Sequence, residues 1–335
     1  MIKIDGTEGG GQMLRSALSL SLITGQPFHM TNIRGKRSKP GLKRQHLSCV
    51  LAALKVCDGS ADGAEMNSKE LLFNLGTLKA GDYHINIGSA GSTSLVAQTL
   101  IPALVHLDLP STLTIEGGTH NPMAPSFHFL EKYYIPSLLE MGYEVDIFLI
   151  KSGFVPAGGG QIEIKITPSK ERNPLVKQTS EDLTARNAII YHHQLPQVAE
   201  KISKLLKKKD PDIMIQETKC PLAECKGLTL QLENIYGGGA YSITTEMVAE
   251  YGLKTQNLIQ KILKAHHTRH AVNAPVGNRL ADQLMLYIAQ IPHSQILTGP
   301  MTNHIKTNAE VIKLFLPDSL EIAKGDSGVV MIKAG

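Results

Sequence analysis

The sequence predicts an α/β protein, in the broad sense that includes α+β folds, and three observations support this prediction. Short segments typical of strands alternate with amphipathic helices along the whole chain. Glycine-rich turns separate many of these segments, as expected where one element passes directly into the next. The chain has 335 residues, 42% of them hydrophobic, so it can bury a sizeable core and is expected to form two domains.

The elements of the first half follow from hydrophobic spacing and from glycine breaks. Apolar residues at helical spacing begin after the glycine run at residues 9–11 and end at Gly25. The expected helices cover residues 13–22, 47–54, a segment that includes 95–98, and 127–141. Strand patterns occupy residues 28–33, 83–87, 112–115, 143–150 and 161–166. The repeated order of strand, helix and strand suggests duplicated units, although no fixed sequence period is present.

In the second half the composition changes, which indicates an inserted domain. The expected helices cover residues 198–209, 258–263 and 279–290, and the expected strands cover 213–215 and 228–232. Glycines 237–239 lie between two strand patterns, so we expect a hairpin turn there and not a phosphate loop. We expect a small α/β domain at residues 178–267, inserted into a large domain formed by residues 1–177 and 268–335.

Charge and cysteine content narrow the classes of protein. The formal net charge is +4, a mild basic bias that fits an anionic partner, and six positive charges fall within residues 34–44. That density favours anion binding over a merely solvated loop. The four cysteines form no paired CxxC motif and are too few for a disulfide scaffold. Cys220 and Cys225 are also too few for a zinc site without two further ligands.

The sequence contains no sign of membrane insertion or export. No apolar stretch reaches transmembrane length, and the N-terminus lacks a basic segment followed by an apolar run. We therefore expect a cytoplasmic protein that has no membrane partner.

Two segments at opposite ends of the chain carry the candidate chemistry. Glu8 lies in a glycine run that leads into a helix, so backbone N–H groups there can face a phosphate and the carboxylate can hold a divalent metal. Glu8 could equally be a carboxylate that stabilises a helix N-terminus. His304 is flanked by small hydroxyl and amide residues and is a candidate nucleophile. Asp282 and Gln98 also have structural explanations. Asp282 could simply form an ion pair with a neighbouring arginine, and Gln98 could simply form a hydrogen bond with a buried backbone group.

Six blocks that follow one another along nearly the whole chain sharpen this interpretation. They are Glu8-Gly9-Gly10-Gly11-Gln12 with Leu14-Arg15-Ser16; Arg34, Arg37, Lys39-Pro40-Gly41-Leu42 and Arg44-Gln45-His46; Gly88-Ser89-Ala90-Gly91-Ser92 with Gln98-Thr99; Ala157-Gly158-Gly159-Gly160; Leu280-Ala281-Asp282-Gln283; and His304 with Thr307-Asn308. Together they resemble the RNA 3′-terminal phosphate cyclase family, in its catalytic, cyclase-type branch. Agreement of six blocks is far more specific than any lone glycine motif.

The resemblance implies a large domain of three repeated βαβ-type units with a smaller α/β domain inserted late in the chain. It also implies an ATP-dependent, ligase-type enzyme of RNA processing. In that reaction a histidine attacks the α-phosphorus of ATP, which gives a covalent histidine–AMP. The AMP then passes to an RNA 3′-terminal phosphate, and the adjacent 2′-hydroxyl closes a 2′,3′-cyclic phosphate and expels AMP. Metal and arginine should neutralise much of the charge that accumulates.

The resemblance also assigns roles to single residues. His304 would be the nucleophile, and Glu8 would bind the divalent metal, Mg²⁺ or Mn²⁺. The ATP site would contain Gln98, Arg279, Leu280, Ala281, Asp282 and Gln283. Phosphates of ATP or of the RNA terminus would be bound by Arg15, Arg34, Arg37 and Arg44, since guanidinium groups bind phosphate through two hydrogen bonds.

Two positions depart from the family's pattern. Only Thr7 separates Gly6 from Glu8, a shorter link than is usual, which bears on where Glu8 lies relative to the metal. Position 279 is arginine where relatives often have an aromatic residue or histidine beside the adenine, although arginine can also stack on a base.

Two other functions stay open on the sequence alone. One is a non-catalytic RNA-binding relative of the same fold that assists ribosome assembly. Such relatives lack the nucleophilic histidine, so the presence of His304 favours the enzyme. The other is a nucleotidyl transferase that acts on a small phosphorylated metabolite. The sequence does not indicate the oligomeric state, the physiological RNA or the preferred metal.

Overall fold

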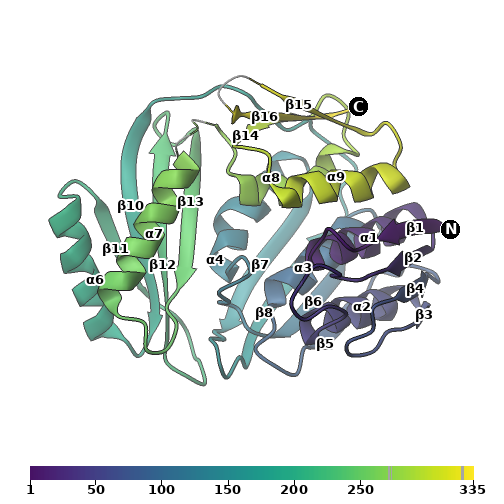
Figure 1. The fold of residues 1–335 in the computed structure, drawn as a ribbon, viewed down its shortest axis with the longest axis horizontal. Helices are drawn as coiled ribbons and strands as arrows, with labels where there is room; N and C mark the ends of the chain where they lie inside the picture. The colour runs from purple at the N-terminus through teal and green to yellow at the C-terminus, as the bar shows by residue number, and fades with distance from the viewer. Residues whose placement is uncertain (271, 273, 326–327) are drawn as a thin grey trace.

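The computed structural model describes residues 1–270, 272, 274–325 and 328–335. Its first four strands belong to a compact unit with the order βαβαββ (Figure 1). The elements are β1 (Ile2–Asp5), α1 (Gly11–Thr24), β2 (Phe28–Thr31), α2 (Arg44–Cys57), β3 (Ser60–Asp62) and β4 (Leu71–Asn74). The sheet order is β1-β2-β4-β3, with β1 and β2 parallel and the other pairs antiparallel.

A second unit repeats this topology. Its elements are β5 (Asp82–Asn86), α3 (Thr93–Leu104), β6 (Ser111–Gly117), a helical segment, β7 (Glu144–Lys151) and β8 (Gly160–Thr167). The sheet order is β5-β6-β8-β7, again with one parallel pair followed by two antiparallel pairs.

The third unit has the same plan but is interrupted. Its elements are β9 (Val176–Lys177), α8 (Asn278–Ile288), β14 (Gln295–Thr298), α9 (Asn303–Phe315), β15 (Leu320–Lys324) and β16 (Val330–Ala334). Its sheet order, read from the other end, is β9-β14-β16-β15. The three βαβ-type units expected from the resemblance are therefore present, each extended by a further helix and two strands.

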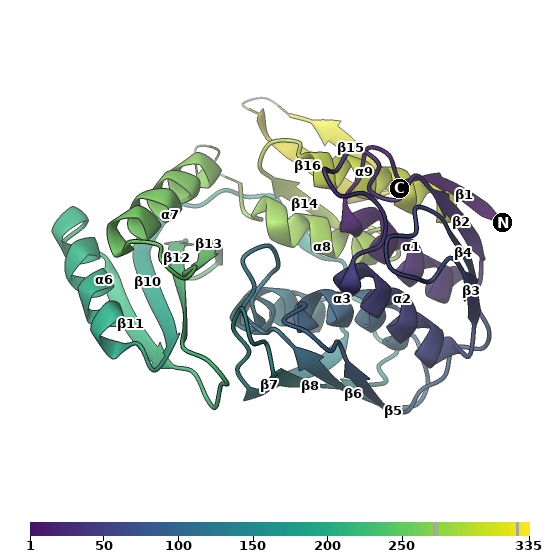
Figure 2. The ribbon, with the colours of Figure 1, turned by 60° about the horizontal axis from the view of Figure 1, so that its bottom comes forward.

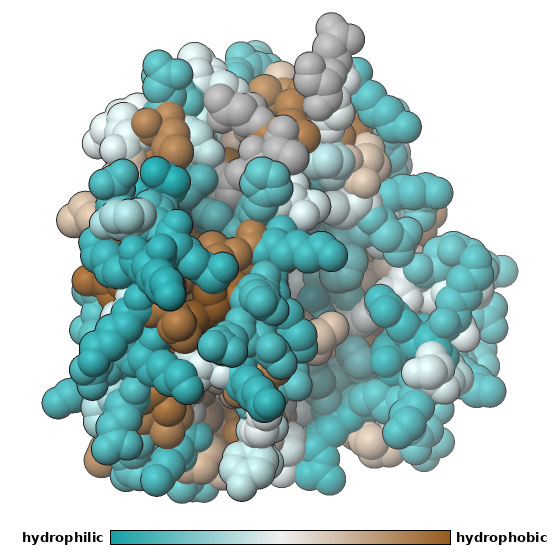
Figure 3. Space-filling model, turned by 60° about the vertical axis from the view of Figure 1, so that its left-hand side comes forward, coloured by the Kyte–Doolittle hydropathy of each residue, from teal (hydrophilic) through white to brown (hydrophobic). Residues whose placement is uncertain are grey.

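Between β9 and α8 the chain forms a separate sheet covered by two helices, which we call the inserted module. Its elements are β10 (Leu183–His193), α6 (Pro196–Lys209), β11 (Met214–Lys219), β12 (Gly227–Tyr236), β13 (Tyr241–Val248) and α7 (Thr255–His270). It has its own hydrophobic core between the sheet and these helices. Figure 3 shows a mainly hydrophilic surface on this side of the molecule, with hydrophobic side chains confined to small areas. The boundaries of the two domains stay a prediction.

The helices of the three units meet in the middle of the large body, and the sheets lie around them (Figure 2). Helix α1 contacts α2, α3 and α9, so its residues are buried on almost every side. The small side chains of Ser16 and Ser19 suit this close packing of helices. This central contact also places the start of α9 beside the glycine run that precedes α1.

The segment predicted as one helix at residues 127–141 is not a regular α-helix. It consists of α4 (Phe127–Phe129), the π-helical segment η1 (Leu130–Tyr134) and α5 (Ile135–Glu140). Ile135 N–H donates to the carbonyl of Leu130, five residues earlier. Pro136 follows and has no N–H to donate, so the regular ladder cannot be restored at that position.

Other expectations are met within a few residues. The hairpin at glycines 237–239 is confirmed, because Tyr236 and Tyr241 face each other across antiparallel β12 and β13. Several elements were not predicted: short strands such as β1, β9 and β16, the longer strand β10, and helix α9, which carries His304. In the part of the chain that the structure describes, no helix is long and apolar enough to cross a membrane.

Candidate active site

His304 lies in the first turn of α9, and local sequence explains its position. The hydroxyl of Thr302 accepts a hydrogen bond from the backbone N–H of Ile305 at 3.1 Å, so Thr302 caps the helix. The His304 side chain is 55% exposed, which leaves its ring accessible to a substrate. The positive end of the helix dipole points to the same place and favours an anion there.

One carboxylate faces this imidazole. Asp282 Oδ2, on α8, lies 3.6 Å from His304 Nδ1, which is within ion-pair range but longer than a good hydrogen bond. Asp282 is 7% exposed, and its position is fixed by Asn308. Asn308 Nδ2 donates to the Asp282 backbone oxygen at 2.8 Å and to its Oδ1 at 3.2 Å. Asp282 is therefore held so that its second oxygen points to the histidine.

The same network reaches the N-terminal glycine run. Ser16 Oγ, on α1, donates to Asn308 Oδ1 at 2.5 Å. Asn303 Nδ2 donates to the backbone oxygen of Glu8 at 3.1 Å, so the loop that carries Glu8 lies directly beside the first turn of α9. The two segments that carry the candidate chemistry are thus neighbours in space although they are nearly 300 residues apart in the sequence.

The carboxylate of Glu8 is exposed and forms an ion pair with Lys36. Asp5, the other acid near this loop, accepts three hydrogen bonds through Oδ1, from Thr7 N, Thr7 Oγ1 and Asn32 Nδ2, which lower its pKa. Asp5 is therefore engaged in shaping the loop, whereas the exposed Glu8 carboxylate faces a cation, the ammonium group of Lys36, which a metal would have to displace. One carboxylate together with substrate phosphates is a donor set that fits Mg²⁺, which commonly keeps several waters.

Positive side chains gather over the glycine run. A Cβ placed on Gly10 would lie 3.1 Å from Arg37 Nη2, and one on Gly11 would lie 2.3 Å from His46 Nε2. A side chain at Gly11 would overlap His46, whereas one at Gly10 would only press on the flexible end of Arg37. Burial and the charges of Arg34, Arg15 and Lys43 lower the pKa of His46 to about 3, so its ring is neutral near pH 7. Burial and the nearby cations both keep this imidazole neutral, and the same cations would attract an anion.

The predicted phosphate-binding arginines fall into two groups. Arg15 and Arg37 lie against the glycine run, and Arg15 also contacts Gln12. Arg34 Nη1 instead donates to the backbone oxygens of Lys39 and Gly41, each at 2.9 Å, and so shapes the basic loop. Arg44 Nη1 donates to the backbone oxygen of Gly88 at 3.0 Å, which ties α2 to the second unit.

Gln98 and Gln283 meet where α3 contacts α8. Gln98 Nε2 donates to Gln283 Oε1 at 2.5 Å. Both side chains line a small cavity of about 20 Å³ together with Gln12, Arg15 and Ser16. These two predicted site residues therefore lie behind the cluster around Arg15 and Asn308. Their role in ATP binding stays a prediction.

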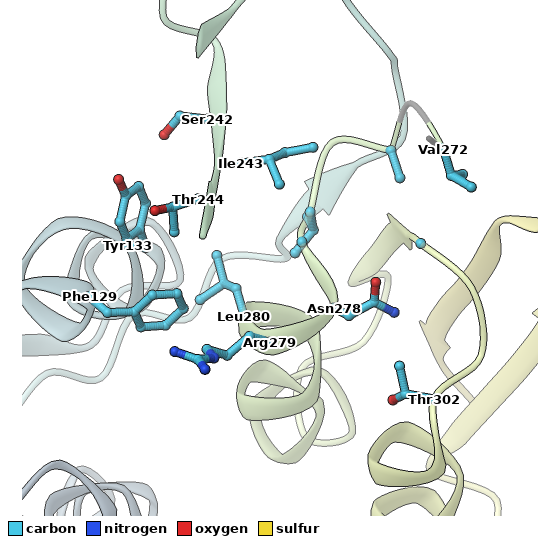
Figure 4. A pocket seen from close by; sticks show the side chains of 14 residues that line it. Phe129, Tyr133, Ser242, Ile243, Thr244, Val272, Asn278, Arg279, Leu280 and Thr302 are labelled. Carbon is cyan, nitrogen blue, oxygen red and sulfur yellow. The ribbon is translucent and has the colours of Figure 1, made fainter. Parts of the chain in front are cut away.

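A larger pocket of about 220 Å³ lies between the inserted module and α8 (Figure 4). Phe129 and Tyr133 form one wall, and residues 242–244 of β13 form another. Arg279 and Leu280, at the start of α8, complete it, and Thr302 lies at its end nearest His304. Ala281 is completely buried in the core and exposes no surface to this pocket.

Arg279 is held in place by the inserted module. Its Nη1 lies 2.6 Å from Glu246 Oε1 on β13, and its guanidinium lies 5.8 Å from the centre of the Phe129 ring. Glu246 also accepts hydrogen bonds from the backbone N–H and the hydroxyl of Ser126, at 2.9 and 2.6 Å. The result is a flat cation beside an aromatic wall, a surface on which a planar ring can stack.

Several residues of this site were not among the predicted site residues. Ser16, Asn308, His46 and Glu246 each make contacts that define its geometry. For Ser16, His46 and Asn308 a signal existed, because all three lie in the six sequence blocks, and Asn308 also lies four residues after His304 on the same helix face. No local pattern indicates Glu246, which comes from the inserted module.

Comparison with known proteins gives a consistent result. The family model for RNA 3′-terminal phosphate cyclase matches residues 6–322. A protein named RNA 3′-terminal phosphate cyclase from Ectopseudomonas mendocina is 39% identical over 99% of this chain and 97% of its own length. Proteins with the same name from Pseudomonas fluorescens and Salmonella typhimurium are 40% and 37% identical, over 96% and 99% of this chain and 94% and 98% of their own lengths.

Proposed function

Because the chain belongs to the RNA 3′-terminal phosphate cyclase family, we propose that it converts an RNA 3′-terminal phosphate to a 2′,3′-cyclic phosphate in an ATP-dependent reaction. The single observation that supports this most strongly is the arrangement around His304. An accessible imidazole lies at a helix N-terminus, faces a buried carboxylate and adjoins both a glycine run and a pocket. This is the set of parts that a histidine needs to attack a nucleotide phosphate.

In the first step the free nitrogen of His304, Nε2, attacks the α-phosphorus of ATP, and pyrophosphate leaves. Asp282 keeps the Nδ1 side of the ring oriented and stabilises the positive charge that the ring acquires on attack. The dipole of α9 stabilises the anionic α-phosphate in the same region. The product of this step is histidine–AMP.

The pocket between α8 and the inserted module is suited to the adenine. Its walls are largely aromatic and aliphatic, and Arg279 offers a flat face beside Phe129. Thr302 at the end of the pocket is two residues from His304, so a nucleotide whose base fills the pocket would have its phosphates near the imidazole.

In the second and third steps an oxygen of the RNA 3′-phosphate attacks the phosphorus of histidine–AMP and releases His304. The neighbouring 2′-hydroxyl then attacks the 3′-phosphorus, loses its proton and expels AMP. Arg37 and Arg15 beside the glycine run would hold the terminal phosphate. A divalent metal held by Glu8 would neutralise phosphate charge.

The cysteine state supports a cytoplasmic location for this activity. All four cysteines are free, and three of them are buried. Free thiols persist in reducing compartments such as the cytoplasm.

Two oligonucleotides test the proposed function. An oligoribonucleotide with a 3′-phosphate, incubated with ATP and Mg²⁺ or Mn²⁺, should acquire a phosphatase-resistant 2′,3′-cyclic end. The same oligonucleotide with a terminal 2′-deoxyribose has no 2′-hydroxyl, so it should accumulate the adenylylated 3′-phosphate and form no ring. If protein that is folded and labelled by ATP modifies neither RNA, the substrate is not an RNA end. Failure of ATP to label the protein would instead favour a non-catalytic RNA-binding role.

A further inference from the structure

A cluster of three potential metal ligands lies away from His304 and takes no part in the proposed reaction. His120 follows β6, His128 belongs to α4, and Cys220 follows β11 in the inserted module. One ring nitrogen of each histidine and the sulfur of Cys220 lie within 4.8 Å of one another, and all three side chains are buried. The ligands thus come from both the large body and the inserted module.

The hydrogen bonds of the two histidines leave one nitrogen of each ring without a partner. His128 Nδ1 donates to Glu131 Oε2 at 3.1 Å, and His120 Nδ1 lies 2.8 Å from Thr119 Oγ1. His120 Nε2 and His128 Nε2 are buried, and neither has a hydrogen-bond partner among the residues that the structure describes. A buried polar atom without a partner costs about 1–3 kcal/mol, so two in one cluster need an explanation.

The surroundings of both rings resemble those of histidines that bind metals. Such histidines usually direct their other nitrogen to a carboxylate, hydroxyl or carbonyl that fixes the ring, as Glu131 and Thr119 do here. The rings are also held by stacking. His120 lies 4.6 Å from the Phe154 ring, and His128 lies 3.7 Å from the Tyr191 ring, between ring centres. Both imidazoles are therefore held in place, and one nitrogen of each ring lies within 4.8 Å of the other and of the Cys220 sulfur.

We propose that His120, His128 and Cys220 bind a zinc ion that joins the inserted module to the large body. Two imidazole nitrogens and one thiolate are a donor set that favours Zn²⁺ over Mg²⁺ or Mn²⁺, which prefer oxygen. Ligand atoms around a tetrahedral zinc ion lie about 3.3–3.6 Å apart, given zinc–nitrogen and zinc–sulfur bonds of about 2.0–2.3 Å. Ligand atoms that lie up to 4.8 Å apart would need to approach one another by up to about 1.5 Å, and water would take the fourth position.

The site would act on the pocket from a distance. His128 adjoins Phe129, which forms a wall of the pocket, and Cys220 belongs to the module whose β13 forms the opposite wall. A zinc ion shared by both bodies would keep these walls at a fixed separation. Its role is structural and is separate from the Mg²⁺ or Mn²⁺ expected at Glu8.

Metal content tests this proposal without using the enzymatic activity. Protein carrying no histidine tag, purified from zinc-containing medium and gel-filtered in excess Mg²⁺, should retain about one zinc per chain. Cys220→Ser and His120→Gln should each lose at least nine-tenths of that zinc. Cys57→Ser is the matched control, because Cys57 is also buried but lies on α2 outside the cluster. It should keep its zinc.

Cobalt gives a second readout that reports directly on the sulfur. Co²⁺ exchanged into the wild-type protein should show thiolate-to-metal charge-transfer absorption, and this band should be absent from Cys220→Ser. If Cys220→Ser does not fold, His128→Gln should still show loss of zinc. Wild-type protein that holds no zinc after gel filtration, or variants that retain it, would overturn the proposal.

Discussion

Replacement of Asp282 by asparagine is the most informative single change at this site. The amide is the same size as the carboxylate, and its oxygen can still accept the hydrogen bond that Asn308 Nδ2 donates to Asp282 Oδ1. The group that faces His304 Nδ1 changes from an anionic acceptor to a neutral N–H donor, so this position loses its negative charge and can no longer accept a hydrogen bond from the ring. We expect the fold to be retained and the formation of histidine–AMP to become slower.

The size of this effect follows from the geometry. Two unit charges 3.6 Å apart interact by about 1 kcal/mol in water and by about 5 kcal/mol at an effective dielectric constant of 20. The His304 ring is 55% exposed, so solvent screens the interaction and the lower part of this range applies. A loss of about 1.4–2.7 kcal/mol in the transition state corresponds to a rate about 10- to 100-fold lower.

The assay is a single-turnover measurement of protein labelling with α-labelled ATP, at saturating ATP. Asp58→Asn is the control, because Asp58 pairs with Lys79 on the exposed surface away from the site. It should label at the wild-type rate. If folded Asp282→Asn also labels as fast as wild type, Asp282 does not assist His304, and the role assigned to this carboxylate is wrong.

Three further changes test the cationic site. The pKa of His46 is about 3 in the folded chain and about 6.5 in the unfolded chain. As the pH falls below 6.5, the unfolded chain therefore takes up a proton on His46 that the folded chain does not, and the free energy of unfolding should be about 2–3 kcal/mol lower at pH 4.5 than at neutral pH. His46→Gln should remove that part of the pH dependence, as measured by urea unfolding at both pH values. Arg37→Ala should weaken binding of a 3′-phosphorylated oligonucleotide about tenfold, as measured by fluorescence anisotropy, and the control Lys207→Ala on α6 should leave binding unchanged. Equal affinities of the wild-type protein for the 3′-phosphate and 3′-hydroxyl forms would contradict this assignment. Gly11→Ala should lower the free energy of unfolding by about 1–3 kcal/mol, since its methyl group would overlap His46, and an unchanged unfolding midpoint would show that the ring can move away.

The sequence predicts many, though not all, of the elements with a long periodic pattern; the long elements α9 and β10 were missed. Helices such as α1 and α6 were predicted within a few residues because their apolar spacing continues over three or more turns. Strands of two to five residues, such as β9 and β16, are too short to show an alternation of their own. Their conformation depends on pairing with distant strands, which a single sequence does not reveal.

The candidate site shows the same division between local and distant information. Glu8 and His304 could be singled out because the residues around them form distinctive motifs. The contact between Ser16 and Asn308 and the ion pair between Arg279 and Glu246 depend on how α1, α9 and β13 are packed. In the sequence Cys220 is near only one other potential zinc ligand, Cys225, whereas the two histidines that lie beside it in the structure, His120 and His128, are about 100 residues earlier.

The central claim is that His304 becomes covalently attached to AMP, and the most direct test is to locate the label. Wild-type protein incubated with α-labelled ATP and a divalent metal should carry an acid-labile, base-stable label on the peptide that contains His304. His304→Ala should carry none while keeping its fold, and His267→Ala, which removes an exposed histidine from α7, should label normally. Label that persists in His304→Ala, or that maps to another residue, would contradict the account.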